Sequence, residues 1–232
     1  MAGIPAALGW VPKDGRDPGV NDDRGGAGLN RFAVADGAAT SARAEVWAEI
    51  LVHAFVGQGL DPFDPAVLAE LRRLWRLEVD RARLPWHAIA KLREGGAAAF
   101  VGLELDSAEM RYRAVAVGDS CILHLRGPEL LRAGPIEDWK CFNRFPQLVG
   151  TTEDESFRAT LWRDEGSYQA GDVFVLASDA LAKYLLRSYG HVNELDIGSC
   201  DGEDEKFAEW VIDARLHDGL DNDDTTVCVV RP

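Results

Sequence analysis

The residues of this sequence most able to do chemistry are aspartates placed at the ends of apolar segments. Asp36-Gly37 closes one such segment, Asp179 follows another, and Asp223 stands just before a third. With an acidic pair further upstream they form a set of oxygen donors: Asp22 or Asp23, Asp36, the Gly37 carbonyl, Asp179 and Asp223. Hard divalent cations such as Mg²⁺ and Mn²⁺ are bound by carboxylates, backbone carbonyls and water. The pattern therefore predicts one acidic metal site assembled from distant parts of the chain.

Such a site would serve hydrolysis of a phosphoester. Carboxylates gathered without a cation repel one another and raise one another's pKa values. A pair of cations removes this repulsion and lets a bridging water ionise near neutral pH. That water can attack phosphorus in line while the cations stabilise charge on the phosphoryl oxygens. No protein nucleophile is then needed.

Each motif also has an ordinary structural explanation. Asp-Gly at a strand end is common in turns for conformational reasons alone, and Gly118-Asp119 fits a hairpin turn equally well. The acidic run from Asp221 to Asp224 could be a calcium loop of EF-hand type, although the expected glycine and distal bidentate Glu are missing. A non-catalytic calcium-binding module is the weaker alternative.

The hydrophobic pattern predicts the elements that must position these aspartates. Strands are expected at 6–11, at the segment ending in Asp36-Gly37, and at 98–105, 112–117, 122–125, 173–177 and 225–230. Helices are expected from an N-cap at Ser41 to Gly57, and at 65–83, 86–93, 179–188 and 203–217. Residues 134–170 are expected to form an irregular, flap-like segment with one strand near 157–162.

The connections between these elements indicate the fold class. Short turns between successive strands favour antiparallel pairing over a parallel sheet. No break in composition, repeat or linker divides the 232 residues, so we expect a single domain spanning 1–232. Two antiparallel runs of strands separated by paired helices predict a layered α+β architecture.

Composition excludes several classes of protein. A formal net charge of −14 does not provide the basic face that binding to nucleic acid or anionic membrane requires. No signal-peptide pattern opens the sequence, and no apolar run reaches the length of about 18 residues that a membrane helix needs. We therefore expect a cytoplasmic protein that binds neither nucleic acid nor membrane.

Five motifs follow one another along the chain: Asn21-Asp22-Asp23-Arg24, Val34-Ala35-Asp36-Gly37, Gly118-Asp119-Ser120, Ala177-Ser178-Asp179-Ala180 and Asp223-Asp224-Thr225-Thr226-Val227. In this order, and at approximately these separations, they resemble the type 2C metal-dependent protein serine/threonine phosphatases, the PPM family, in its divergent bacterial branch. Each motif is weak alone, but the series spans nearly the whole chain. The resemblance implies a four-layer αββα sandwich of two antiparallel β-sheets flanked by helices.

The resemblance also implies a role for each matching residue. Asp36 resembles the carboxylate that bridges two cations, and Gly37 the residue that offers its carbonyl to one of them. Asp179 and Asp223 resemble ligands of the other cation. The implied cofactors are two ions of Mn²⁺ or Mg²⁺, with a third possible.

The remaining acidic motif residues are carried over in the same way. Asp22 and Asp23 stand in place of the family's acidic pair, which holds the second cation directly or through water, and Asp23 would share the catalytic role with Asp36. Asp119 resembles a ligand of a third, weaker site. Asp224 replaces a frequent Asn and is expected to orient its neighbours by hydrogen bonds.

The sequence departs from the family pattern at two places. Ala38-Ala39 stand where Gly-Gly is usual, with no His or Glu following to protonate the leaving group. Where an arginine that grips the phosphate is expected, the sequence has Pro18, which leaves Arg16, Arg24 and Arg43 as candidates.

The resemblance implies hydrolysis of phosphoserine and phosphothreonine on proteins, in opposition to a serine/threonine kinase. Because of the two departures, the alternative is a catalytically impaired member that acts as a phosphoprotein-binding or scaffold module in signalling.

Overall fold

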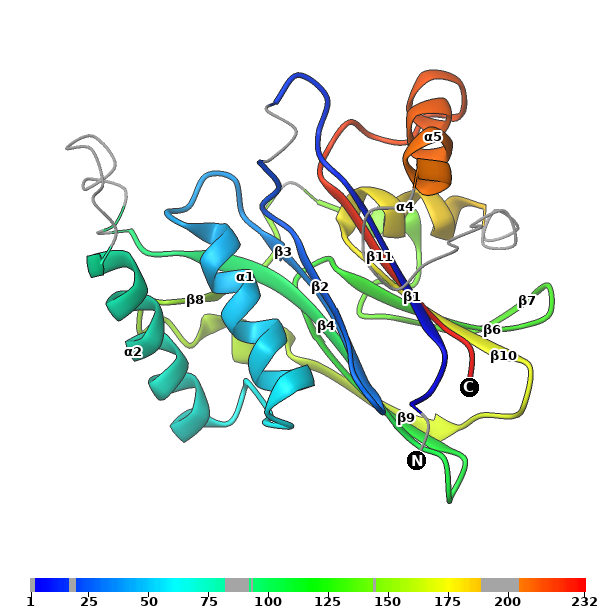
Figure 1. Cartoon of the computed structure of the whole chain (residues 1–232), viewed down its shortest axis with the longest axis horizontal. Helices are drawn as coiled ribbons and strands as arrows, with labels where there is room; N and C mark the ends of the chain where they lie inside the picture. The colour runs from blue at the N-terminus through cyan, green and yellow to red at the C-terminus, as the bar shows by residue number, and fades with distance from the viewer. Residues whose placement is uncertain (1–2, 17–19, 82–91, 93, 144, 189–204) are drawn as a thin grey trace.

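The structure of the chain, a computed structural model, describes every residue except 1–2, 17–19, 82–91, 93, 144 and 189–204. Its centre is a pair of antiparallel sheets (Figure 1). Sheet A has the order β1 (Ala6–Val11), β11 (Thr225–Val230), β10 (Asp172–Ala177), β6 (Cys121–Arg126) and β7 (Glu129–Gly134). Sheet B has the order β2 (Arg24–Ala27), β3 (Arg31–Gly37), β4 (Ala97–Asp106), β5 (Arg111–Val117) and β9 (Trp162–Ser167), with β8 (Val149–Gly150) beside β4.

The central strands are covered on both faces, which explains why they read as nearly continuous apolar runs in the sequence. Successive side chains of a strand point to opposite faces of its sheet. In β3, Val34 packs between the two sheets, whereas Ala35 faces the outer helices. In β10, Leu176 points inward and Val175 outward. Each strand therefore contributes to two separate hydrophobic cores.

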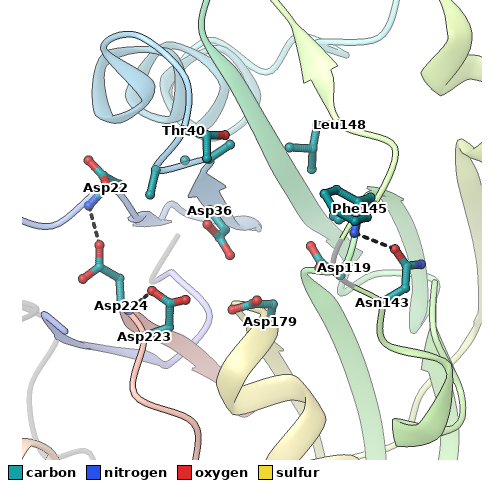
Figure 2. Close-up of a pocket in the computed structure, with 14 residues that line it drawn as sticks. Asp22, Asp36, Thr40, Asp119, Asn143, Phe145, Leu148, Asp179, Asp223 and Asp224 are labelled. Carbon is teal, nitrogen blue, oxygen red and sulfur yellow. Dashed lines mark hydrogen bonds between the residues drawn. The ribbon is translucent and has the colours of Figure 1, made fainter. Parts of the chain in front are cut away.

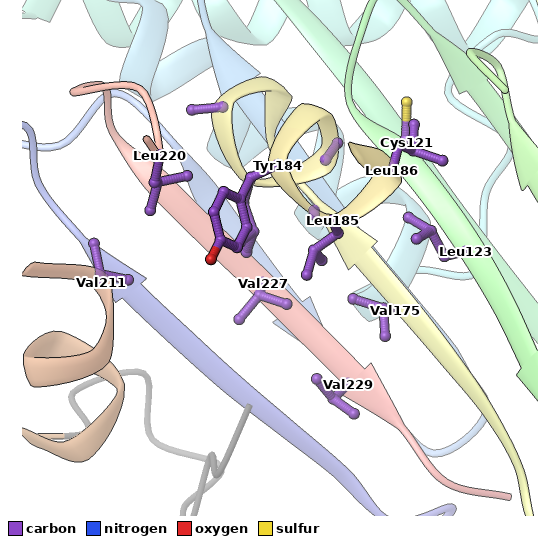
Figure 3. Close-up of a cluster of buried hydrophobic side chains, with 14 of the residues drawn as sticks. Cys121, Leu123, Val175, Tyr184, Leu185, Leu186, Val211, Leu220, Val227 and Val229 are labelled. Atoms are coloured by element: carbon purple, nitrogen blue, oxygen red, sulfur yellow. The ribbon is translucent and has the colours of Figure 1, made fainter. Parts of the chain in front are cut away.

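Helices form the two outer layers. Sheet B is covered by α1 (Ala44–Val52), which continues into a π-helical turn (His53–Gly57), and by α2 (Pro65–Arg81). Sheet A is covered by α4 (Asp179–Arg187) and by α5 (Glu205–Asp213), which continues into a π-helical turn (Ala214–Asp218). Figure 3 shows Leu185 of α4 beside Val175 and Val227 of sheet A. The predicted four-layer αββα sandwich is confirmed.

Within the described residues, no helix has both the length and the apolar character needed to cross a bilayer.

The start of α1 differs from the prediction. Its N-cap is Arg43, whose backbone is left-handed with φ 50°, and not Ser41. The Ser41 hydroxyl instead donates to the Ala38 carbonyl at 2.9 Å and accepts from the Ala97 N–H at 3.0 Å. Ser41 therefore fastens the turn that follows Asp36-Gly37 to β4, and the helix begins later.

The edges of the sheets also differ from the prediction. The hydrophobic pattern does not predict β2 or β7, and the strand expected near 157–162 is a 3₁₀ helix (Ser156–Thr160), with β9 beginning only at Trp162. β2 has four residues, and β2 and β9 are rich in glycine or charged residues, so their apolar signal is weak. Apart from β8, β9 and the 3₁₀ helices Trp139–Cys141 and Ser156–Thr160, the described residues of 135–170 lie outside helices and strands. The helix expected at 86–93 falls largely outside the described residues.

The core between the sheets should dominate stability. We expect Leu176→Ala to lower the free energy of unfolding by about 2–5 kcal/mol, because Leu176 is fully buried and its truncation leaves a cavity. Leu131→Ala is the control, since Leu131 is 37% exposed on β7. Guanidinium unfolding of both variants measures the difference, and equal losses would contradict this assignment of the core.

Candidate metal centre

A pocket of about 450 Å³ opens at one end of the sandwich (Figure 2). Six of the described aspartates line it: Asp22, Asp36, Asp119, Asp179, Asp223 and Asp224. Topology explains why they meet. In an antiparallel pair the end of one strand lies beside the start of the next, so Asp179 after β10 lies beside Asp223 before β11. Likewise β3 and β5 both run antiparallel to β4, so Asp36 and Asp119 share the same end of sheet B.

Asp23 lies beneath this lining and is the most deeply buried of the predicted ligands. Asp23 is 3% exposed, and neither of its carboxylate oxygens has a hydrogen-bond partner of ordinary geometry. Burial, with a further contribution from the charge of Asp224, raises the pKa of Asp23 to about 8, and the hydroxyls of Ser178 and Thr226 offset only part of this. A buried carboxylate without a partner is costly, so this one needs an explanation.

Asp36 and Asp179 form the centre of the acidic cluster and point toward each other (Figure 2). Burial, followed by the charges of Asp23 and Asp179, raises the pKa of Asp36 well above its ordinary value. Burial and then the charge of Asp223 raise the pKa of Asp179, while a hydrogen bond from the Asp36 carboxyl lowers it in part. Burial and mutual repulsion therefore both disfavour ionisation of the two side chains together.

Asp119 extends the cluster toward the wall of the pocket that contains Phe145 and Leu148 (Figure 2). It follows the turn residue Gly118, which needs glycine because its φ is +86° and a Cβ would lie 2.6 Å from the Cβ of Ala99. Burial, followed by the charge of Asp179, raises the pKa of Asp119 to about 7. Its position beside Asp179 is compatible with the third-site role implied by the resemblance, which stays a prediction.

Among the described residues, the cationic side chains that balance the cluster lie along one flank. Arg16 Nη1 donates to Asp22 Oδ2 at 2.9 Å and to Asp224 Oδ2 at 3.4 Å. Lys13 Nζ lies 3.5 Å from Asp223 Oδ1, in a pair that is about half exposed. Within the part of the chain that the structure describes, no Lys or Arg makes an ion pair with Asp36, so the middle of the cluster is uncompensated there.

Gly37 allows the acidic segments to approach each other closely. A Cβ at this position would lie 2.6 Å from the Asp22 carbonyl oxygen and 2.9 Å from the backbone of Ala44. Both neighbours are backbone atoms that cannot rotate away. Glycine at this position therefore lets Asp22 lie beside the strand end that carries Asp36.

Asp172, a buried carboxylate at the other end of sheet A, has a structural role and provides a comparison for Asp23. Asp172 accepts two hydrogen bonds from Arg126, at 2.7 and 2.9 Å, and further ones from His124 and the Gln169 N–H. Burial alone would raise the pKa of Asp172, but these hydrogen bonds outweigh it and hold the pKa below its ordinary value. Asp23 is as buried and has none of these partners.

The chemistry of the donor set fits hard divalent cations. The pocket offers carboxylate oxygens and the backbone of Gly37, with no Lys, Arg or His among the described lining residues. Among all described residues, however, no three Asp, Glu, His or Cys side chains converge as a closed metal site.

The three candidate arginines lie in different places. Arg16 contacts the pocket through Asp22. The Arg24 guanidinium donates to the backbone carbonyls of Asn21 and Asp23, each at 2.7 Å. Arg43 pairs with Glu45 and lines a separate groove between α1 and α2. Of the three, Arg16 is the one whose guanidinium bonds to a residue of the acidic lining.

The opposite wall of the pocket is not evident from the sequence. It is formed by Asn143, Phe145, Pro146 and Leu148, from the segment between β7 and β8. Phe145 is 87% exposed, and its backbone N–H donates to Asn143 Oδ1 at 2.8 Å. No periodic pattern marks this segment, so its place opposite Asp36 depends on the folded connection.

Comparison with solved structures identifies the fold. The Mycobacterium tuberculosis serine/threonine phosphatase PstP/Ppp matches with a TM-score of 0.66 at 20% identity, over 98% of each chain. The catalytic domain of PstP in complex with two manganese ions matches with a TM-score of 0.62 at 20% identity, over 98% of this chain and 99% of that one. The serine/threonine phosphatase Stp1 from Staphylococcus aureus matches with a TM-score of 0.67 at 14% identity, over 100% of this chain and 97% of that one.

No protein-family model and no curated protein matches the chain by sequence. At these identities the likeness establishes the fold, which is that of the type 2C serine/threonine phosphatases. The resemblance drawn from the five motifs is thereby confirmed at the level of fold.

The acidic cluster predicts an unusual pH dependence for the metal-free chain. Between the ordinary pKa of 3.8 and the raised values of about 7 for Asp119 and about 8 for Asp23, the native state binds more protons than the unfolded state. Stability must then fall as pH rises through this range. We expect the Tm in EDTA to fall from about pH 5.5 to about pH 8.

Two variants localise this effect. Asp23→Asn should reduce the fall in Tm, because it removes the buried carboxyl that must ionise. Asp218→Asn, which removes an exposed carboxyl outside the pocket, should leave the fall unchanged. A Tm that is constant or rises over this range in the wild-type chain would contradict the electrostatic description of the pocket.

Proposed function

We propose that this protein is a metal-dependent phosphatase that removes phosphate from serine and threonine side chains of proteins. The observation that carries the proposal is the pocket, in which aspartates from distant segments meet, several of them with raised pKa values. The fold supports it, because solved serine/threonine phosphatases share nearly the whole architecture.

The proposed cofactors are Mn²⁺ or Mg²⁺, since one of the similar structures is a complex with two manganese ions. Asp36, the Gly37 carbonyl, Asp179 and Asp223 would hold them, together with Asp22 and Asp23. When bound, the cations would supply an activated water between them and neutralise the phosphoryl oxygens. Asp119 would assist at a third position.

The protein's own residues determine what can enter. The acidic lining repels a phosphate group as long as its carboxylates are not neutralised, which makes activity dependent on metal. Arg16 would contact a phosphate oxygen, a role supported by its hydrogen bond to Asp22, which lines the pocket. On the opposite wall, Phe145 and Leu148 offer apolar surface to the peptide that carries the phosphate.

A non-catalytic role is the second candidate. The described lining contains no Lys, Arg or His that could protonate a leaving alkoxide, and Ala38 and Ala39 occupy the place of the expected Gly-Gly. A chain of this kind would bind phosphoproteins, as a module or scaffold in signalling, without hydrolysing them. A cytoplasmic location and an opposing serine/threonine kinase stay predictions under either proposal.

Hydrolysis of p-nitrophenyl phosphate and of a phosphothreonine peptide, with and without Mn²⁺, tests the proposal. We expect Mn²⁺-dependent turnover that falls at least about 100-fold in kcat/KM in Asp36→Asn and Asp179→Asn, since even residues that only support a metal ligand contribute about 10–100-fold.

Asp218→Asn serves as the control and should match the wild-type chain, because Asp218 is exposed and outside the pocket. Equal residual activity in the wild-type chain and both pocket variants would end the enzyme proposal. Binding of the phosphopeptide without turnover would favour the scaffold role.

A further inference from the structure

We propose that Asp224 is a positioning residue that holds Asp22 at the pocket, and that this role requires a carboxylate at a fixed distance from β11. The inference rests on the proposed function, because Asp22 matters only if the pocket binds cations. It concerns a residue that lines the pocket without being one of the predicted ligands.

The Asp224 carboxylate is occupied by donors from the N-terminal part of the chain. Its Oδ1 accepts from the Lys13 N–H at 2.8 Å. Its Oδ2 accepts from the Asp22 N–H at 2.8 Å and from Arg16 Nη1 at 3.4 Å. The side chain is 6% exposed. Both oxygens are therefore already satisfied by the protein, which distinguishes Asp224 from the partnerless carboxylate of Asp23.

The pattern of donors calls for a carboxylate rather than a carboxamide. Two acceptor positions face backbone N–H groups, one from Lys13 and one from Asp22. An Asn side chain has a single acceptor oxygen, and its NH₂ group would face one of these N–H donors in either orientation. One buried backbone donor would then lose its partner, which is costly in a buried site.

The same residue links two predicted ligands that lie far apart in the sequence. Its backbone N–H donates to Asp223 Oδ1 at 3.0 Å, while its side chain holds the backbone of Asp22. Asp224 therefore fixes the segment that carries Asp22 relative to the segment that carries Asp223.

A second tie supports the same arrangement from behind. Arg215, whose side chain is 4% exposed, donates to the Asp223 carbonyl at 2.6 Å and to the Pro12 carbonyl at 3.0 Å. Asp224 and Arg215 thus join the N-terminal residues to the start of β11 at two points. Arg215 contacts backbone carbonyls of Pro12 and Asp223, whereas the Asp224 carboxylate contacts the backbone N–H of Asp22 itself.

The experiment measures Mn²⁺ binding by titration calorimetry in the absence of substrate, using the full chain and three variants. Asp224→Asn removes an acceptor and a charge. Asp224→Glu keeps the charge but moves the carboxylate by one methylene. Asp221→Asn is the matched control, because Asp221 lies in the same loop and its carboxylate accepts from Lys183 Nζ at 2.6 Å, in a pair that is about half exposed.

We expect Mn²⁺ affinity to fall about tenfold in Asp224→Asn and also to fall clearly in Asp224→Glu, as a lost hydrogen bond that positions a ligand would require. Asp221→Asn should stay within about twofold of wild type. In hydrolysis assays, excess Mn²⁺ should restore most of kcat to the Asp224 variants, with KM for p-nitrophenyl phosphate unchanged. A role in stability alone would lower Tm without moving the Mn²⁺ affinity.

Several outcomes overturn the inference. Wild-type Mn²⁺ affinity in Asp224→Asn would overturn it. Wild-type Mn²⁺ affinity in Asp224→Glu would also overturn it, because the charge of the side chain, and not its position, would then be sufficient. If Asp224→Asn fails to fold, Asp224→Glu decides the question by itself. A wild-type chain that binds Mn²⁺ but hydrolyses nothing ends only the phosphatase proposal, whereas one that binds no Mn²⁺ contradicts both.

Discussion

Repulsion among buried carboxylates is the constraint on which the rest of this structure depends. Asp23, Asp36 and Asp179 lie close enough that the charge of one raises the pKa of another, and no lysine or arginine of the described residues pairs with Asp36. Such an arrangement disfavours folding, so the surrounding sandwich must hold the carboxylates in place against their own charge. The two sheets do so because Asp36 and Asp179 are attached to the ends of β3 and β10, which are buried on both faces.

The cationic side chains that compensate the cluster also connect the N-terminal segment to the residues before β11. Arg16 and Lys13 contact Asp22 and Asp223 from the N-terminal side, and Arg215 binds carbonyl groups behind them. This places the cations at one flank and leaves the middle of the pocket acidic. Among the described residues, no side-chain cation pairs with Asp36 or Asp179, so these two carboxylates lack the compensation that Asp22 and Asp223 have.

The sequence predicted the inner strands well and the edges poorly. The strand ending in Asp36-Gly37, and the strands before Asp179 and after Asp223, have apolar residues on both faces, so their signal is strong. The edge strands β2 and β9 face solvent or consist of glycine and charged residues, and their pairing comes from hydrogen bonds to a neighbour rather than from a pattern of their own. Ser41 resembles an N-cap in sequence but is used by the turn before the helix.

The sequence by itself determined which carboxylates are candidates for binding a cation and, through the order of five motifs, which fold to expect. Only the tertiary structure decided which carboxylates remain without partners, how Asp224 holds Asp22, and that Phe145 lies opposite Asp36. The physical reason is the separation along the sequence over which each effect acts. Apolar periodicity and strand ends are local properties of the chain, whereas burial, repulsion and hydrogen bonding at the pocket depend on residues about two hundred positions apart.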